Sequence, residues 1–160
     1  MAFTMVEIVV VVVIMSIAAL LAIPMLSSAG DSQVKSAANI VASDIEYAKN
    51  LAIGRQKNYS IVFDTAADSY EVRDSDNAVI EHPMTKKPYS ITFSNDSRLS
   101  SVKINTADFD STSTLYFDYL GTPYSGSLDP LKNAGVITLN ADEFSLTVKV
   151  QPMTGYISIE

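Results

Sequence analysis

Few side chains in this sequence could do chemistry together. Its 160 residues include one histidine, His82, and no cysteine. Cysteine nucleophiles, thiolate metal sites, disulfides and paired-histidine mechanisms are therefore excluded. Serine is plentiful, but the sequence contains no G-x-S-x-G motif, phosphate-binding loop or dinucleotide fingerprint. His82 lies in "IEHPMTKKP", which predicts an exposed loop. We therefore expect a protein that is not an enzyme and has no cofactor.

Two groups of acidic side chains are close enough in sequence to suggest a calcium site. Asp74, Asp76 and Asn77 form one group, and Asp108 and Asp110 form the other. Calcium takes about six to eight oxygen ligands, and neither group supplies a full binding loop. We interpret both groups as solvated turns and assign no metal ligand.

The chain is acidic, with 11 Lys and Arg against 18 Asp and Glu and a formal net charge of -7. Phosphate binding needs clustered basic side chains. Lys86 and Lys87 are adjacent basic residues, and Arg98 is a third candidate for contacting phosphate. Many acidic residues surround them in the sequence. We do not expect nucleic acid as a partner, and DNA binding stays an alternative function.

Glu7 is the side chain of the N-terminal region that needs a chemical explanation. It stands at the start of an apolar run, because Ile8–Leu26 is apolar except for Ser16 and Pro24. As a helix, the 21 residues of Phe3–Ile23 would be about 31 Å long, enough to cross a hydrocarbon core. This region is therefore predicted to be a transmembrane helix.

A cleaved secretory signal fits the run less well, because no Lys or Arg precedes it and it is long for a signal peptide. Its valines favour a strand in water, but a lone segment in lipid must satisfy its backbone as a helix. A carboxylate in such a segment needs a partner, and the next basic side chain is Lys35. Glu7 therefore either pairs with an α-amino group, its own or a neighbour's, or sits solvated among lipid headgroups.

The stretch "FTMVEIVVVVVIMSIAALLAIP" resembles the N-terminal segment of type IV pilins and type II secretion pseudopilins, with Phe3, Glu7 and Pro24 at matching places. The resemblance implies that a prepilin peptidase cuts between Ala2 and Phe3 and that the new Phe3 amine is N-methylated. It also implies that Glu7 pairs with the N-terminal amine of an adjacent subunit during assembly. The family usually has Gly before the cut and a short basic leader, whereas this sequence has Met1 and Ala2.

A further helix is expected at about 31–54. Pro24 removes one backbone donor and predicts a kink or an interruption before it, and Gly30 is interpreted as a flexible point. Candidate N-caps are Ser28, Asp31 and Ser32. Apolar residues then recur at steps of three and four residues, which is typical of an amphipathic helix. They are Val34, Ala37, Ala38, Val41, Ile45, Ala48, Leu51 and Ala52. We expect this stripe to pack on a sheet of the same chain, with Gly54 ending the helix to within about two residues.

Residues 57–160 are predicted to be rich in β-structure. The segments 58–64 and 69–74 alternate apolar and polar residues around "TAAD", which predicts a hairpin. Further strands are expected at "AVIEH", "YSITF", "SVKIN", "TLYFDY", "VITLN", "FSLTVKV" and "GYISIE". The fold class is therefore α+β: a long N-terminal helix, half transmembrane and half amphipathic, packed on an antiparallel sheet or on two small sheets.

Three segments of this region narrow the resemblance. "DIEYAKNLAIGRQKNYSIVFD", "YFDYLGTPYSG" and "VKVQPMTGYISI" look like the H-type minor pseudopilins and the related FimT-like minor pilins. The resemblance implies the pilin fold, with a residual leader at 1–2, a transmembrane and assembly helix at 3–26 and a soluble domain at 27–160.

It further implies a structural subunit, a minor pseudopilin or minor pilin, of a type II secretion or type IV pilus-like filament. The implied partners are other pilin or pseudopilin subunits, the prepilin peptidase, an inner-membrane assembly platform and, before assembly, the lipid bilayer. The implied location is the bacterial inner membrane, single-pass with the domain in the periplasm, and then a periplasmic or surface filament. The alternatives are a DNA- or cargo-binding minor pilin in uptake or adhesion, a major pilin subunit, and a membrane-tethered enzyme.

Overall fold

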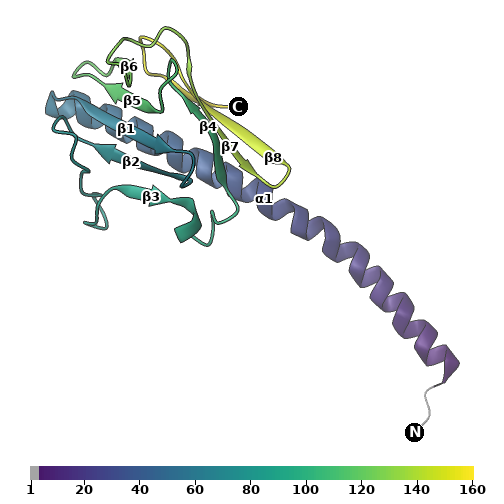
Figure 1. The fold of residues 1–160 in the computed structure, drawn as a ribbon. Helices are drawn as coiled ribbons and strands as arrows, with labels where there is room; N and C mark the ends of the chain where they lie inside the picture. The colour runs from purple at the N-terminus through teal and green to yellow at the C-terminus, as the bar shows by residue number, and fades with distance from the viewer. Residues whose placement is uncertain (1–3) are drawn as a thin grey trace.

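The computed structural model describes residues 4–160, except for the side chains of residues 20–28. One helix, α1 (Met5–Arg55), runs through 51 residues, and the strands follow it along the chain. Figure 1 shows the C-terminal half of α1 lying against the strands and its N-terminal half projecting away from them. The predicted α+β class, a long N-terminal helix with antiparallel sheets, is confirmed.

The strands form two antiparallel sheets. The first has the order β3-β2-β1-β5-β6, and the second has the order β4-β7-β8-β9. The elements of the first sheet are β1 (Tyr59–Asp64), β2 (Ser69–Arg73), β3 (Ser90–Thr92), β5 (Thr114–Phe117) and β6 (Pro123–Ser125). Those of the second are β4 (Lys103–Asp108), β7 (Gly135–Ala141), β8 (Phe144–Val150) and β9 (Ile157–Ile159), and a short 3-10 helix, η1 (Phe93–Asn95), follows β3. The predicted hairpin is confirmed as the β1–β2 pair, with Asp64 opposite Ser69.

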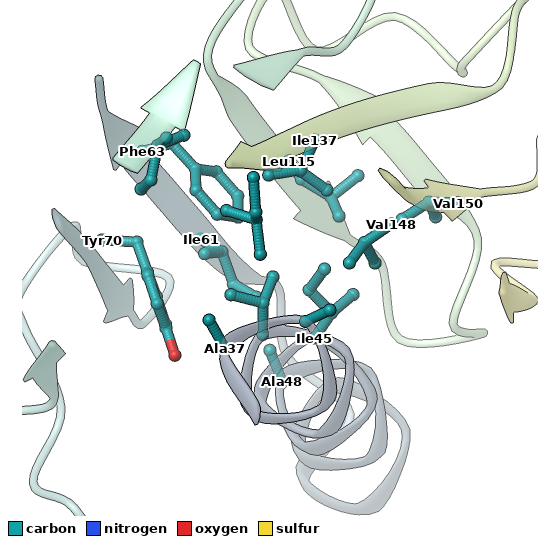
Figure 2. Close-up of a cluster of buried hydrophobic side chains, with 14 of the residues drawn as sticks. Ala37, Ile45, Ala48, Ile61, Phe63, Tyr70, Leu115, Ile137, Val148 and Val150 are labelled. Carbon is teal, nitrogen blue, oxygen red and sulfur yellow. The ribbon is translucent and has the colours of Figure 1, made fainter. Parts of the chain in front are cut away.

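The core lies where α1 meets both sheets. The predicted stripe is buried, since Val34, Ala37, Ala38, Val41, Ile45, Ala48 and Ala52 are at most 1% exposed and Leu51 is half-buried. In Figure 2, Ile45 and Ala48 point toward the inner faces of the strands. Ile61 and Leu115 come from the first sheet, and Val148 and Val150 come from the second. Alanines on the stripe let the helix approach the strands closely, while each buried Ile or Val contributes about 1.5–3 kcal/mol.

The helix does not stop between its two halves. The helical backbone continues through Pro24 and Gly30, so the predicted interruption and the predicted N-caps are wrong. A proline removes a single backbone donor, and good helix formers on both sides maintain the remaining bonds. The end of α1 at Arg55 agrees with the predicted stop near Gly54, and Gln56 takes the left-handed conformation with φ 52°.

Gly30 is buried rather than flexible. A Cβ atom there would lie 2.8 Å from Asp142 Oδ2 and 3.2 Å from the carbonyl oxygen of Ala141. These residues belong to the tight turn between β7 and β8. The glycine therefore lets α1 pass close to this turn as it enters the domain.

Two strand predictions differ from the structure. The segment "AVIEH" forms only isolated bridges, Arg73 with Val79 and Glu81 with Pro88, because the chain turns away at His82. Conversely, β6 lies in "GTPYSG", where no strand was predicted. Its proline is tolerated because β6 is the edge strand of the first sheet and needs to pair on one side only.

Candidate assembly site

The first turn of α1 is built by Thr4 and Glu7. Thr4 is the N-cap, and its hydroxyl oxygen accepts a hydrogen bond from the backbone N–H of Glu7 at 3.3 Å. This satisfies one of the donors that every helix start leaves unpaired. A carboxylate at this position is also favoured by the positive end of the helix dipole. This cap was not predicted, although the spacing Thr-x-x-Glu is the pattern of a capping box.

The Glu7 side chain itself is free of partners among residues 4–160. It is exposed, and no Lys or Arg of the described chain lies within ion-pair distance of it. The helix start therefore explains why an acid is tolerated at this position. It leaves both carboxylate oxygens available to a group from outside this part of the chain.

The stem, defined as residues 5–19 of α1, carries large apolar side chains on all its faces. From Val6 to Ile17 every Val, Ile and Met is at least 49% exposed. Ser16 is the polar exception after Glu7, and its hydroxyl donates to the carbonyl oxygen of Val12 at 2.8 Å, so its hydrogen-bonding need is met within the helix. Exposed apolar surface of this extent marks a site of contact with protein or lipid.

No helix is long and apolar enough to cross a membrane, as far as the described residues go.

The structure describes the four predicted site residues to different extents. Ala2 and Phe3, the predicted cleavage position, lie outside the described residues. Glu7 lies exposed in the first turn of α1. Pro24 lies within the continuous helix, in the range whose side chains are not described.

A second polar cluster, missed by the sequence analysis, joins α1 to the first sheet. The carboxylate of Asp44 accepts hydrogen bonds from the Tyr70 hydroxyl at 2.5 Å and from the Tyr89 hydroxyl at 2.8 Å. The His82 ring lies edge-on to the Tyr89 ring, with 4.5 Å between the ring centroids. The centroid of the Tyr47 ring lies 5.7 Å from that of Tyr89. The cluster fixes the segment before β3 and the strand β2 onto the helix.

Burial dominates the titration of this cluster. It raises the pKa of Asp44 above the ordinary value of 3.8, although the hydrogen bonds from the two tyrosine hydroxyls act in the opposite direction. The pKa values of Tyr70 and Tyr89 are also raised, by burial first and then by the Asp44 charge. The neutral hydroxyl groups of Tyr70 and Tyr89 therefore connect the sheet to the carboxyl group of Asp44 on the helix. No nucleophile stands next to an activating base among these residues.

His82 is half-buried against this cluster, not merely a surface loop residue as predicted. Its Nδ1 atom accepts hydrogen bonds from the backbone N–H groups of Met84 at 3.2 Å and Thr85 at 3.3 Å. Nδ1 is therefore an acceptor, and the ring is used to shape the loop that follows it.

The acidic groups considered for calcium are used as turn acceptors. Asp74 Oδ1 accepts from the backbone of Asp76 and Ala78, each at 3.0 Å. Asp110 accepts from the backbone of Lys132 at 2.7 Å, and such bonds lower the pKa of that carboxyl. Within residues 4–160, side chains of metal-binding type do not gather in groups of three or more.

Some of the basic side chains are matched with acids. Five of the 11 Lys and Arg residues make ion pairs within the described chain. The pairs are Lys35–Asp31, Lys49–Glu46, Arg73–Glu71, Arg98–Asp96 and Lys149–Glu160. Arg98, one of the three candidate phosphate contacts, is among them, which disfavours phosphate binding at that position.

The fold is shared with solved pilin-like structures. The chain is similar to the minor pseudopilin EpsH from the type 2 secretion system of Vibrio cholerae, with a TM-score of 0.57 and 10% identity over 80% of this chain and 96% of that one. It is also similar to the type IV minor pilin FimU of Pseudomonas aeruginosa, with a TM-score of 0.54 and 14% identity over 81% of this chain and 90% of that one. A second crystal form of FimU gives a TM-score of 0.51 at 13% identity.

No family model matches the sequence, and no curated protein matches it significantly. The structural neighbours establish that this chain has the pilin-like fold of the H-type minor pseudopilins and minor pilins.

Proposed function

We propose that this chain, whose fold is that of the minor pseudopilins and minor pilins, is a structural subunit of a type II secretion or type IV pilus-like filament. The observation that carries the proposal is the stem, a helix with exposed apolar side chains on every face that projects from a folded domain (Figure 1). Such a helix is stable in water only when another apolar surface covers it. Neighbouring stems in a filament core would provide that surface.

Assembly through the stem explains its composition. Between helices in an apolar environment, close packing and polar pairs set the alignment, since the hydrophobic effect adds little there. Valine and isoleucine from Ile8 to Ile14 give the stem a compact, regular surface. Its single internal hydroxyl, on Ser16, is already satisfied.

Glu7 would supply the polar pair. Its partner would be the N-terminal amine of an adjacent subunit, freed by cleavage between Ala2 and Phe3 and N-methylated afterwards. In a dry filament core, an unpaired carboxylate would be strongly unfavourable, and removal of one partner would destabilise the contact by about 3–5 kcal/mol. The pair would therefore fix how far one stem slides along the next.

Before assembly, the apolar stretch that includes the stem would lie in the bacterial inner membrane, with the domain in the periplasm. The support is the sequence of Phe3–Ile23, which lacks charge except for Glu7 near its start. In that state a prepilin peptidase and an inner-membrane assembly platform would act on the chain. DNA binding is not preferred as the function, because the chain has a formal net charge of -7 and Arg98, one of the three candidate phosphate contacts, is paired with Asp96.

Photo-crosslinking tests the assembly proposal. An amino acid with a benzophenone side chain is incorporated in place of Val10 or Ile14 in the stem. A control variant carries it in place of Met84, which is 86% exposed but lies on the domain. We expect stem variants in the host to give crosslinks to other pilin-like subunits, whatever their identity, and the Met84 variant to give none of these. Stem crosslinks to lipid alone, under conditions that produce filaments, would contradict the proposal.

Mass analysis of the N-terminus tests the processing step separately. The chain isolated from its host should begin at Phe3 and carry one additional methyl group. An intact Met1 would show a plain anchor and would overturn the proposed pairing of Glu7 with a new amine.

A further inference from the structure

The outward face of the first sheet carries a hollow that the assembly proposal does not use. Two adjoining hollows of about 310 Å³ and 230 Å³ share Asn58, Tyr116 and Leu128 as lining residues. The larger one is also lined by Phe117, Asp118, Tyr119 and Tyr124. Figure 1 places β5 and β6 at the end of the domain where α1 finishes, far from the N-terminus. The hollow would stay accessible when the stem is covered.

The strand register explains how the tyrosines gather there. Tyr116 on β5 and Tyr124 on β6 are directly opposite each other. Their neighbours Phe117 and Pro123 point to the buried side, so both tyrosines lie on the outward face of the sheet. Neither ring is paired with another aromatic ring among the described residues. Aromatic stacking within the described chain therefore does not occupy the faces of these two rings.

Polar groups around these rings are also free. The hydroxyl groups of Tyr116, Tyr119 and Tyr124 and the side-chain amide of Asn58 make no hydrogen bond within residues 4–160. Each of these groups lines the hollow and can donate a hydrogen bond to a ligand or accept one from it.

The charge of the hollow restricts the ligand. Asp118 and Asp74 are among its lining residues, and no Lys or Arg is. One oxygen of Asp118 is occupied by the backbone of Leu120 at 2.9 Å and Thr122 at 2.8 Å. The other carboxylate oxygen of Asp118 can accept a hydrogen bond from a ligand. Phosphates and acidic peptides would be repelled here.

We propose that this hollow binds a neutral saccharide. A sugar ring offers slightly positive C–H groups, which suit the negative face of an aromatic ring, and several hydroxyl groups. Those hydroxyl groups would donate to and accept from the free tyrosine, asparagine and aspartate groups. Concave sites of this size, with apolar walls and few polar groups, are typical of small-molecule binding. The proposal does not depend on filament assembly.

Ligand-observed saturation-transfer NMR on the full chain tests this proposal. The chain is held in a polyoxyethylene detergent, because alkyl glycosides would compete, and maltotriose, cellotriose and chitotriose are offered separately. We expect transfer to the ring protons of at least one trisaccharide. Tyr124→Leu and Tyr116→Leu should each weaken binding roughly three- to tenfold.

Tyr156→Leu is the matched control, because Tyr156 is 63% exposed and outside the hollow. It should leave saturation transfer unchanged. Thermal unfolding of each variant verifies that the domain still folds. No transfer to any of the three sugars, or equal transfer to the wild type and a folded Tyr124→Leu variant, would overturn the proposal. Loss of a subunit contact in Tyr124→Leu without sugar binding in the wild type would identify a protein interface instead, which also overturns it.

Discussion

The hydroxyl of Tyr89 donates a hydrogen bond to Asp44 Oδ1 at 2.8 Å and thereby links the segment before β3 to α1. Tyr70 donates to the other carboxylate oxygen from β2. A buried carboxylate is costly unless its oxygens are satisfied. This one is satisfied by β2 and by the segment before β3, so it fixes the position of the first sheet on the helix.

Tyr89→Phe should destabilise the domain by about 1 kcal/mol, since one oxygen of Asp44 loses its donor while the packing of the ring is kept. Chemical denaturation, followed by far-UV circular dichroism, measures the change. Tyr156→Phe removes an exposed hydroxyl and should have no effect. Equal stability of Tyr89→Phe and Tyr156→Phe would contradict a stabilising role for the hydrogen bond between Tyr89 and Asp44.

The stability of the domain should depend on pH through Asp44. Burial raises its folded pKa above 3.8, so between that value and the folded pKa the folded state binds more protons than the unfolded state. The contribution of the protonated group is fully present below the unfolded pKa and is lost as the pH rises through the folded pKa.

Comparison of the wild type with Asp44→Asn isolates this contribution from the other carboxyl groups. The free energy of unfolding of the wild type minus that of the variant should decrease as the pH rises from about 3 to 7. A difference that stays constant, or that increases with pH, would mean that the carboxyl is not held in an unfavourable buried environment.

Gly30→Leu should destabilise the entry of α1 into the domain. The new side chain would meet Asp142 Oδ2 and the Ala141 carbonyl oxygen, and overpacking of this kind costs about 1–3 kcal/mol. Gly54→Leu is the matched control, because a Cβ there meets nothing within 4 Å and leucine favours a helix more than glycine does. Thermal unfolding should show opposite shifts for the two variants. A destabilisation at Gly54 as large as at Gly30 would remove the explanation by close approach.

Local pattern was sufficient to predict the parts of the fold that depend on periodicity. The stripe from Val34 to Ala52 was found because burial on one face of a helix repeats in sequence. The β1–β2 hairpin was found because its turn joins two alternating segments. Strand β6 was missed because "GTPYSG" has the composition of a turn, and its pairing with β5 is a tertiary interaction.

Tertiary contacts also explain what was missed at the candidate sites. Asp44 lies off the apolar stripe, and its partners Tyr70 and Tyr89 are 26 and 45 residues away in sequence. Glu7 was found because a charge beside an apolar run is unusual. Its cap partner Thr4 could have been found from the Thr-x-x-Glu spacing. The close packing at Gly30 could not be predicted locally, because it involves the β7–β8 turn, which lies more than a hundred residues further along the chain.

The most direct test of the assembly account measures how much Glu7→Ala and Thr4→Ala enter filaments sheared from the host, relative to the wild type. Thr4→Ala removes the hydrogen bond that caps α1, a loss of about 1 kcal/mol, and keeps the carboxylate. The account predicts that Glu7→Ala is absent from filaments, although its domain folds, and that Thr4→Ala is incorporated. Normal incorporation of Glu7→Ala, or equal loss of both variants, would contradict it, because Glu7 would then serve only the start of the helix.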